Sequence, residues 1–197
     1  MVEEAVPQSD GITAAAVDAS GGWVRRLILL RHGTPMAEEE NPRRPLSEQG
    51  KSEAEFTAKG VAAYLGTPTA GGAKLLHSGK DRAKETAEAI EQALTAAGWL
   101  CRCEDTKGLD PKDTPDAALA LVRDVAESVL IMVGHLPHMG FLSSRLIAEP
   151  AAAGRLGGCF HPAGGLALVL ADGSAPQGKW VEAKQIETGV AWWECGP

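Results

Sequence analysis

The sequence lacks the features of a disulfide-stabilised, secreted or membrane-spanning protein. Its 197 residues include only four cysteines, and their spacing is irregular (Cys101, Cys103, Cys159 and Cys195), so a disulfide framework is not expected. No apolar run approaches the roughly 20 residues that a membrane helix requires. The first 22 residues contain acidic but no basic side chains, which is unlike a signal peptide. We therefore expect a reduced, cytoplasmic protein with no membrane partner.

Positive charge is also scarce. The formal net charge of -7 and the pI near 5.3 argue against nucleic acid as a partner, so any phosphate site has to come from a local cluster of arginines. The composition, 44% apolar and 23% charged, is that of a globular protein with a buried core. Residues 1–22, rich in Ala, Ser, Gly and acidic residues, are predicted to form a flexible leader. Residues 23–197 are predicted to form a single domain.

Short apolar segments alternate with longer helical ones along the chain. Alternation of this kind indicates βαβ units and a mostly parallel sheet, so the predicted fold class is a three-layer α/β/α sandwich. The predicted strands cover 23–30, 73–77, 99–104, 128–133, 165–170 and 179–186, and the predicted helices cover 48–65 (with Ser47 as N-cap), 80–97, 114–127 and 138–147. In the first helix, we expect Phe56, Val61, Tyr64 and Leu65 to share the buried face.

Three predicted strands end in, or just before, residues suited to anion binding. The carboxyl ends of parallel strands meet at one edge of a sheet, which is where ligands bind in open α/β folds. The residues concerned are Arg31 and His32 after the first strand, Arg82 after the second and His135 after the fourth, with Arg44 available from the loop 35–45. Their convergence at one edge predicts a functional site.

This set of side chains suits phosphoryl transfer. Arginine guanidinium groups match phosphate oxygens and stay charged at any relevant pH, and a neutral imidazole can attack phosphorus near pH 7. A second, protonated histidine would donate to oxygens that gain charge in the transition state. No metal and no cofactor is expected. The pair His135 and His138 has a spacing that can bind zinc, but no third ligand at a suggestive spacing supports that alternative.

Three segments in order resemble the histidine phosphatase superfamily, also called the phosphoglycerate mutase-like fold. The first is Leu30-Arg31-His32-Gly33, the signature of that superfamily. The second runs from Ser78 to Ala87 and places an arginine before an Ala-x-x-Thr helix. The third is Val133-Gly134-His135-Leu136-Pro137. The resemblance covers about residues 24–186 and implies the phosphoglycerate mutase-like fold.

Within the superfamily, the chain is most similar to the SixA-type phosphohistidine phosphatases. Arg44-Pro45-Leu46-Ser47 before a helix is similar to their arginine-proline-leucine segment. The resemblance implies that His32 attacks phosphorus and becomes phosphohistidine. It also implies that Arg31, Arg82 and Arg44 hold the phosphate oxygens, that His135 contacts the same phosphoryl group, and that water hydrolyses the intermediate. We expect the other ring nitrogen of His32 to donate to a backbone carbonyl, which would fix the attacking tautomer.

The sequence departs from the broader superfamily in its general acid. Mutases and many phosphomonoesterases of this fold carry a glutamate in a long insertion, where this chain has only the short loop 105–113. The nearest substitutes are Glu38, Glu39 and Glu40, and the sequence does not choose among them. A phosphorylated imidazole needs less acid catalysis, because once protonated it leaves as neutral imidazole. We therefore expect phosphohistidine on a protein as the substrate. A small phosphate ester, or phosphate binding without catalysis, are the alternatives.

Overall fold

A computed structural model describes residues 26–147, 158–170 and 180–186. The predicted leader, residues 1–22, and the first three residues of the first predicted strand lie outside the described residues. In what is described, strands and helices alternate as the sequence predicts up to residue 147, and two further strands follow. They are β1 (Arg26–Arg31), α1 (Glu48–Leu65), β2 (Ala73–His77), α2 (Asp81–Ala96), β3 (Cys101–Asp105), α3 (Pro115–Asp124), β4 (Val129–Gly134), α4 (His138–Ile147), β5 (Gly165–Leu170) and β6 (Trp180–Ile186).

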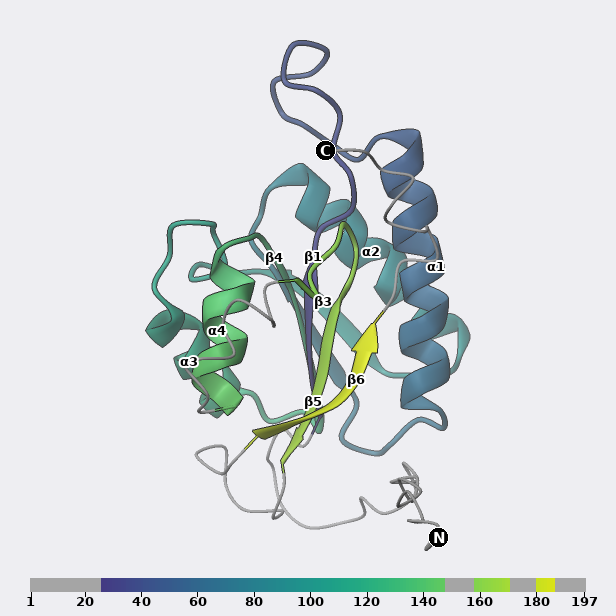
Figure 1. Cartoon of the computed structure of the whole chain (residues 1–197). Helices are drawn as coiled ribbons and strands as arrows, with labels where there is room; N and C mark the ends of the chain where they lie inside the picture. Colours follow the sequence, from purple (N-terminus) through teal and green to yellow (C-terminus); the bar gives the residue numbers. More distant parts are fainter. Residues whose placement is uncertain (1–25, 148–157, 171–179, 187–197) are drawn as a thin grey trace, which may run out of the picture.

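The six strands form one sheet in the order β3-β2-β4-β1-β5-β6. Strands β3, β2, β4 and β1 pair in parallel, whereas β5 pairs antiparallel with both β1 and β6. Helices α1 and α2 lie on one side of the sheet and α3 and α4 on the other (Figure 1). The predicted three-layer α/β/α sandwich with a mostly parallel sheet is therefore confirmed.

The run Leu27–Leu30 is apolar at every position because β1 is covered on both faces. All four side chains are fully buried. Leu27 and Leu29 pack into the core beneath α3 and α4, whereas Ile28 and Leu30 pack into the core beneath α1 and α2. A strand buried on both faces has no solvent-facing side to supply polar residues.

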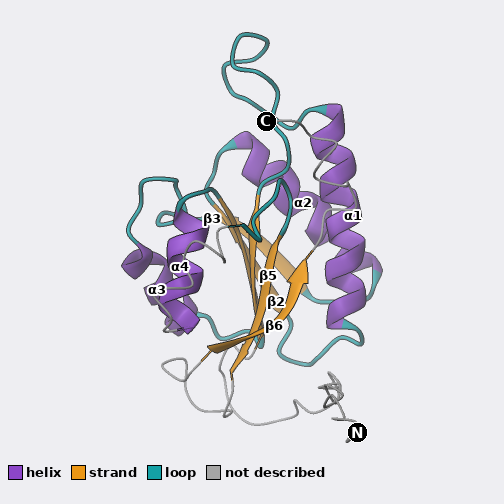
Figure 2. Cartoon of the chain, in the orientation of Figure 1, coloured by secondary structure: helices purple, strands orange, loops and turns teal. Residues whose placement is uncertain are grey.

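The register of the central strands places the predicted strand ends side by side. Arg31 pairs with Gly134 at the end of β1 and β4, and His77 at the end of β2 pairs with Val133 of β4. The loops after these strands therefore start from the same edge of the sheet. The loop between β1 and α1 projects beyond that edge (Figures 1 and 2).

Helix α1 begins where the sequence predicts, but its buried face differs from the prediction. Ser47 is the N-cap, and its hydroxyl accepts from the backbone N–H of Gly50. The prediction for Phe56 is wrong, because its side chain is 51% exposed. The buried face includes Glu53 and Thr57 instead. These polar residues satisfy the backbone of neighbouring loops, so the helix faces the sheet with hydrogen-bonding groups as well as apolar ones.

Several element boundaries also differ from the predicted ones by one to three residues, and two of these differences exceed one residue. Helix α3 ends at Asp124 rather than at residue 127, and β3 begins at Cys101 rather than at residue 99. Boundaries of this kind are the least determined by local sequence. Among the described helices, none combines the length and the apolar composition needed to cross a membrane.

Candidate active site

His32 is held at the carboxyl end of β1 by its own backbone. Its N–H donates to the carbonyl of Gly134 at 3.1 Å, and its carbonyl accepts from the N–H of Ala163 at 3.0 Å. Thr57 of α1 in turn donates its hydroxyl to the carbonyl of Ala163. The histidine is therefore fixed between the end of β4 and the turn before β5, and it is 7% exposed.

The hydrogen bonds of the His32 ring define its tautomer. Nδ1 lies 2.7 Å from the carbonyl oxygen of Gly33, and a carbonyl can only accept, so Nδ1 carries the proton. Nε2 accepts from Nε of Arg82 at 3.2 Å, and an arginine can only donate. The lone pair therefore resides on Nε2, on the arginine side of the ring, as expected from the sequence.

His135 lies against His32, with 4.7 Å between the ring centroids and 59° between the ring planes. It is buried, and its Nε2 is 2.7 Å from the hydroxyl of Ser78, which follows β2. Burial, followed by the proximity of His32 and Arg82, lowers the pKa of His135 to about 2. A charged ring next to arginines and away from water is unfavourable. The second histidine is thus neutral in this arrangement, in contrast to the protonated form expected from the sequence.

The predicted arginines surround the same point. Arg31 is half-buried and donates from its guanidinium to the carbonyl of Phe160 at 3.3 Å. Burial, together with the charges of Arg82, Arg31 and Arg44, lowers the pKa of His32 to about 4, although the hydrogen bond to the Gly33 carbonyl acts to raise it. All three arginines therefore lie close enough to His32 to disfavour a second positive charge there. Arg44 is held in the left-handed region, with φ of 52°, a conformation that is uncommon outside glycine.

Thr34, two residues after His32, is anchored by a buried carboxylate that the sequence reasoning missed. Glu53 is 2% exposed. It accepts from the Thr34 N–H at 2.7 Å and from the Thr34 hydroxyl at 2.9 Å. The N–H of Gly33 donates to the hydroxyl of Thr86 on α2 at 3.1 Å. A glutamate on the apolar face of α1, between Gly50 and Thr57, was the sequence signal that could have identified this anchor.

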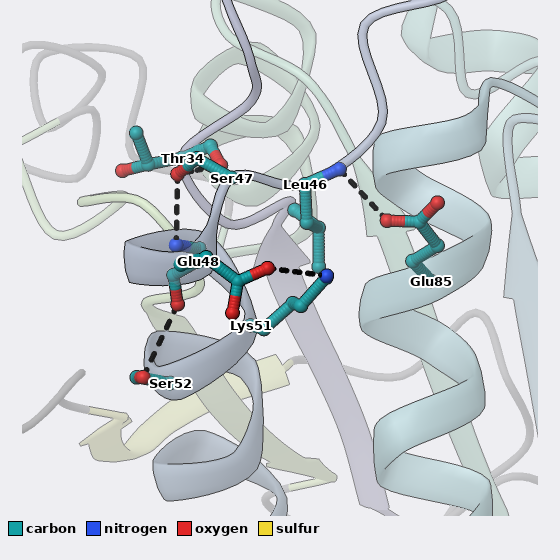
Figure 3. A network of polar contacts seen from close by, with 8 residues as sticks. Thr34, Leu46, Ser47, Glu48, Lys51, Ser52 and Glu85 are labelled. Atoms are coloured by element: carbon teal, nitrogen blue, oxygen red, sulfur yellow. Dashed lines mark hydrogen bonds and ion pairs between the residues drawn. The ribbon is translucent and has the colours of Figure 1, made fainter.

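The return of the loop onto α1 is fixed by further polar contacts (Figure 3). The N–H and hydroxyl of Ser47 both donate to the carbonyl of Thr34. The N–H of Leu46 donates to the Glu85 carboxylate of α2 at 2.7 Å. The loop after His32 is therefore tied at both ends to the two helices that cover this face of the sheet.

The three candidate acids lie apart from these contacts. Glu38, Glu39 and Glu40 are exposed on the projecting loop (Figure 1), whereas His32 is buried at its base. Two ion pairs flank the start of α2, where Arg82 lies. They are Arg43 with Asp81 at 2.7 Å and Lys80 with Asp110 at 3.0 Å.

The remaining histidines of the motifs have structural partners. His77 accepts the N–H of Gly79 on its Nδ1 at 3.1 Å. His138 is buried at the start of α4, and its Nδ1 donates to the carbonyl of Asp113 at 3.0 Å. Within the described residues, no three side chains of the His, Cys, Asp and Glu types group in a way that could hold a metal ion.

The depressed pKa of His32 makes a prediction about stability. In the unfolded chain this ring protonates near pH 6.5, whereas its pKa of about 4 keeps it neutral in the folded protein until much lower pH. The unfolded state then binds the extra proton, so stability falls as the pH drops from about 6.5 towards 4. When the pH falls from 7 to 5, the protonation of this ring in the unfolded chain should lower the free energy of unfolding by about 2 kcal/mol.

Urea unfolding at both pH values measures that loss, with His32→Gln as the matched variant that lacks the titrating ring. The wild type should lose more stability than the variant over this interval. A histidine NMR titration follows the ring directly. A His32 signal that titrates near pH 6.5 in the folded protein would contradict the prediction.

Comparison with known proteins identifies the fold. No protein-family model and no curated protein matches the sequence. Solved structures do match. A protein described as a SixA phosphohistidine phosphatase from Agrobacterium tumefaciens is 22% identical over 83% of this chain and 97% of its own, with a TM-score of 0.65. The protein histidine phosphatase SixA in complex with tungstate is 18% identical over 83% of this chain and 97% of its own, with a TM-score of 0.64.

Phosphoglycerate mutase from Plasmodium falciparum shares the fold at 20% identity, over 81% of this chain and 88% of its own, with a TM-score of 0.57. The chain therefore has the phosphoglycerate mutase-like fold found in histidine phosphatases. Among proteins of this fold it is similar to the SixA proteins, and the fold that the sequence resemblance implies is confirmed.

Proposed function

We propose that the protein is a phosphatase that works through a phosphohistidine intermediate on His32, and that its substrate is phosphohistidine on a protein. The observation that carries the proposal is the state of the His32 ring. Its proton is held on Nδ1 by the Gly33 carbonyl at 2.7 Å, and its lone pair is on Nε2, 3.2 Å from Nε of Arg82. An imidazole in this state is a nucleophile next to a phosphate-binding group.

In the proposed reaction, the substrate phosphoryl group binds between Arg31, Arg82 and Arg44. Nε2 of His32 forms a bond to phosphorus while the bond from phosphorus to the substrate nitrogen breaks, and the departing imidazole takes up a proton. Water then attacks phosphorus while the bond from phosphorus to Nε2 of His32 breaks. Inorganic phosphate leaves, a proton of the water passes to solvent, and His32 returns to its starting state. The arginines neutralise the charge on the phosphoryl oxygens in both steps, and His135 adds a hydrogen bond.

Two observations support a protein substrate. The solved structure with a TM-score of 0.65 is described as a phosphohistidine phosphatase, and the one with a TM-score of 0.64 as a protein histidine phosphatase. The three candidate acids are exposed on the projecting loop, and a phosphorylated imidazole is the leaving group that needs least help from an acid. A small phosphate ester is the competing substrate class, because a glucosyl-3-phosphoglycerate phosphatase, at 18% identity and a TM-score of 0.57, shares the fold.

Turnover of a phosphorylated histidine-containing carrier protein, measured beside a panel of small phosphate esters, tests the substrate class. We expect the carrier protein to be hydrolysed with the higher kcat/KM. A strong preference for one small ester would overturn the protein-substrate proposal. Phosphate binding with no turnover of any substrate would show a binding module instead.

The arginine-based mechanism predicts the response to two reagents. Activity should survive exhaustive chelation, because guanidinium groups supply the positive charge. Orthovanadate should inhibit by occupying the phosphoryl position next to His32. Initial rates with an aryl phosphate, with and without each reagent, provide the measurement. Loss of activity with the chelator, restored by a divalent metal, would contradict the mechanism.

A further inference from the structure

Ser78 makes a short contact within the site that the proposed reaction does not use. It directly follows β2, and β2 lies next to β4, whose last residue precedes His135. The Ser78 hydroxyl lies 2.7 Å from Nε2 of His135, and the His135 side chain is 2% exposed. A buried ring with one nitrogen already bonded has only the other nitrogen left to offer a ligand.

The protonation state of His135 limits what that second nitrogen can do. Burial and the neighbouring positive groups keep its pKa near 2, so the ring is neutral at pH 7 and carries one N–H and one lone pair. Phosphoryl oxygens only accept hydrogen bonds. A lone pair on Nδ1 would repel them, whereas an N–H on Nδ1 would bind them. The ring proton therefore has to be on Nδ1 for this histidine to bind a phosphoryl oxygen while Ser78 keeps Nε2.

A serine hydroxyl can donate or accept, and so it can select between the two tautomers of the ring it contacts. We infer that Ser78 donates to Nε2 of His135 and thereby fixes the ring proton on Nδ1, from which neutral His135 donates to the transferred phosphoryl group. Ser78 is then a positioning residue that acts through His135. Both the tautomer and the phosphoryl contact are argued from the proposed function, whereas the measurement of the tautomer needs no turnover.

Under this inference, the two adjacent histidines both carry their ring proton on Nδ1, but they present different nitrogens to the phosphoryl group. His32 directs its Nδ1–H to the Gly33 carbonyl and keeps the Nε2 lone pair for phosphorus. His135 directs its Nε2 lone pair to Ser78 and keeps the Nδ1–H for the phosphoryl oxygens. A neutral donor assists the oxygens without adding a further positive charge beside the nucleophile, which would make the His32 lone pair less nucleophilic.

Nitrogen-15 NMR of the histidine-labelled protein at pH 7 tests the tautomer without any substrate. The His135 signals are identified by their loss in His135→Gln. We expect a protonated Nδ1 and an unprotonated Nε2, and a mixture of the two tautomers in Ser78→Ala. A proton on Nε2 in the wild type would overturn the inference. Because this readout needs no turnover, it is independent of whether the protein hydrolyses phosphohistidine.

Steady-state kinetics test whether the contact between Ser78 and His135 contributes to catalysis. Loss of one hydrogen bond that strengthens in the transition state should lower kcat of Ser78→Ala about five-fold with KM unchanged. Ser78→Thr keeps the hydroxyl and should retain the wild-type kcat and tautomer. Ser143→Ala removes another buried hydroxyl, on α4, that bonds only the Gly140 carbonyl in the part of the chain described, and should leave kcat unchanged.

An unchanged kcat in Ser78→Ala would overturn the positioning role. So would an equal loss in Ser143→Ala, since that would indicate a general effect of deleting buried hydroxyls. Inorganic phosphate added to the labelled wild type provides a second readout of the contact. The His135 Nδ1 signal should shift on saturation and the Nε2 signal should not, and the reverse pattern would count against the inference.

Discussion

Replacing His32 by alanine should abolish turnover of every phosphorylated substrate, with a loss of at least about 10⁴-fold in kcat. The ring supplies the atom that bonds to phosphorus in the proposed reaction, and no neighbouring group can replace it, because the lone pair of His135 faces Ser78 in the inferred tautomer. The variant should still bind vanadate through the arginines, although more weakly. Single-turnover assays with phosphorylated carrier protein and with an aryl phosphate measure the loss.

His32→Gln controls for the loss of packing in this experiment. A glutamine has atoms that can bond both the Gly33 carbonyl and Arg82, the two partners of the native ring, but it cannot form a phosphoramidate. It should be as inactive as the alanine variant and closer to the wild type in thermal stability at pH 7. In the wild type, rapid acid-free quenching should trap a labelled phosphoryl group on His32. Full activity in either variant would rule out the mechanism.

Much of the fold could be predicted from the sequence, because a buried strand needs an apolar run and parallel strands must end at the same edge of a sheet. The apolar run before Arg31 could only be a strand covered on both faces, and the structure buries it completely. The residues at the strand ends could be expected to meet because parallel strands finish at one edge. The observed register, Arg31 beside Gly134 and His77 beside Val133, has that arrangement.

The supporting contacts could not be predicted in the same way, because each depends on two segments whose separation only the folded chain sets. The place of Glu53 on the apolar face of α1 indicates a buried role, but its partner Thr34, at 2.7 Å, is set only by the folded chain. Phe56 is predicted to lie in the core only because its side chain is hydrophobic. The buried face of α1 instead runs through Thr57, Val61 and Leu65, and the Phe56 ring, which lies off that face, is exposed.

The backbone of α1 at Gly50 packs against Thr34 in the loop after His32. This contact predicts that Gly50→Ala will lower both stability and activity. A methyl group at Gly50 would overlap the carbonyl oxygen of Thr34. That atom belongs to the backbone and also accepts from Ser47, so it cannot move without disturbing the segment that carries His32. Overpacking of this type costs about 1–3 kcal/mol, which lowers the melting temperature of a protein of this size by about 2–12 °C.

Gly60→Ala is the matched control, because Gly60 lies in the same helix. A methyl group there would meet nothing within 4 Å. At an exposed helical position, alanine is more stable than glycine by about 1 kcal/mol. The control should therefore melt higher than the wild type and keep its kcat, whereas Gly50→Ala should melt lower and lose kcat because His32 shifts relative to Arg82. Equal melting temperatures for the two variants would show that α1 and the loop after His32 are not in backbone contact at Thr34. A destabilised but fully active Gly50→Ala would show that the position of His32 does not depend on that contact.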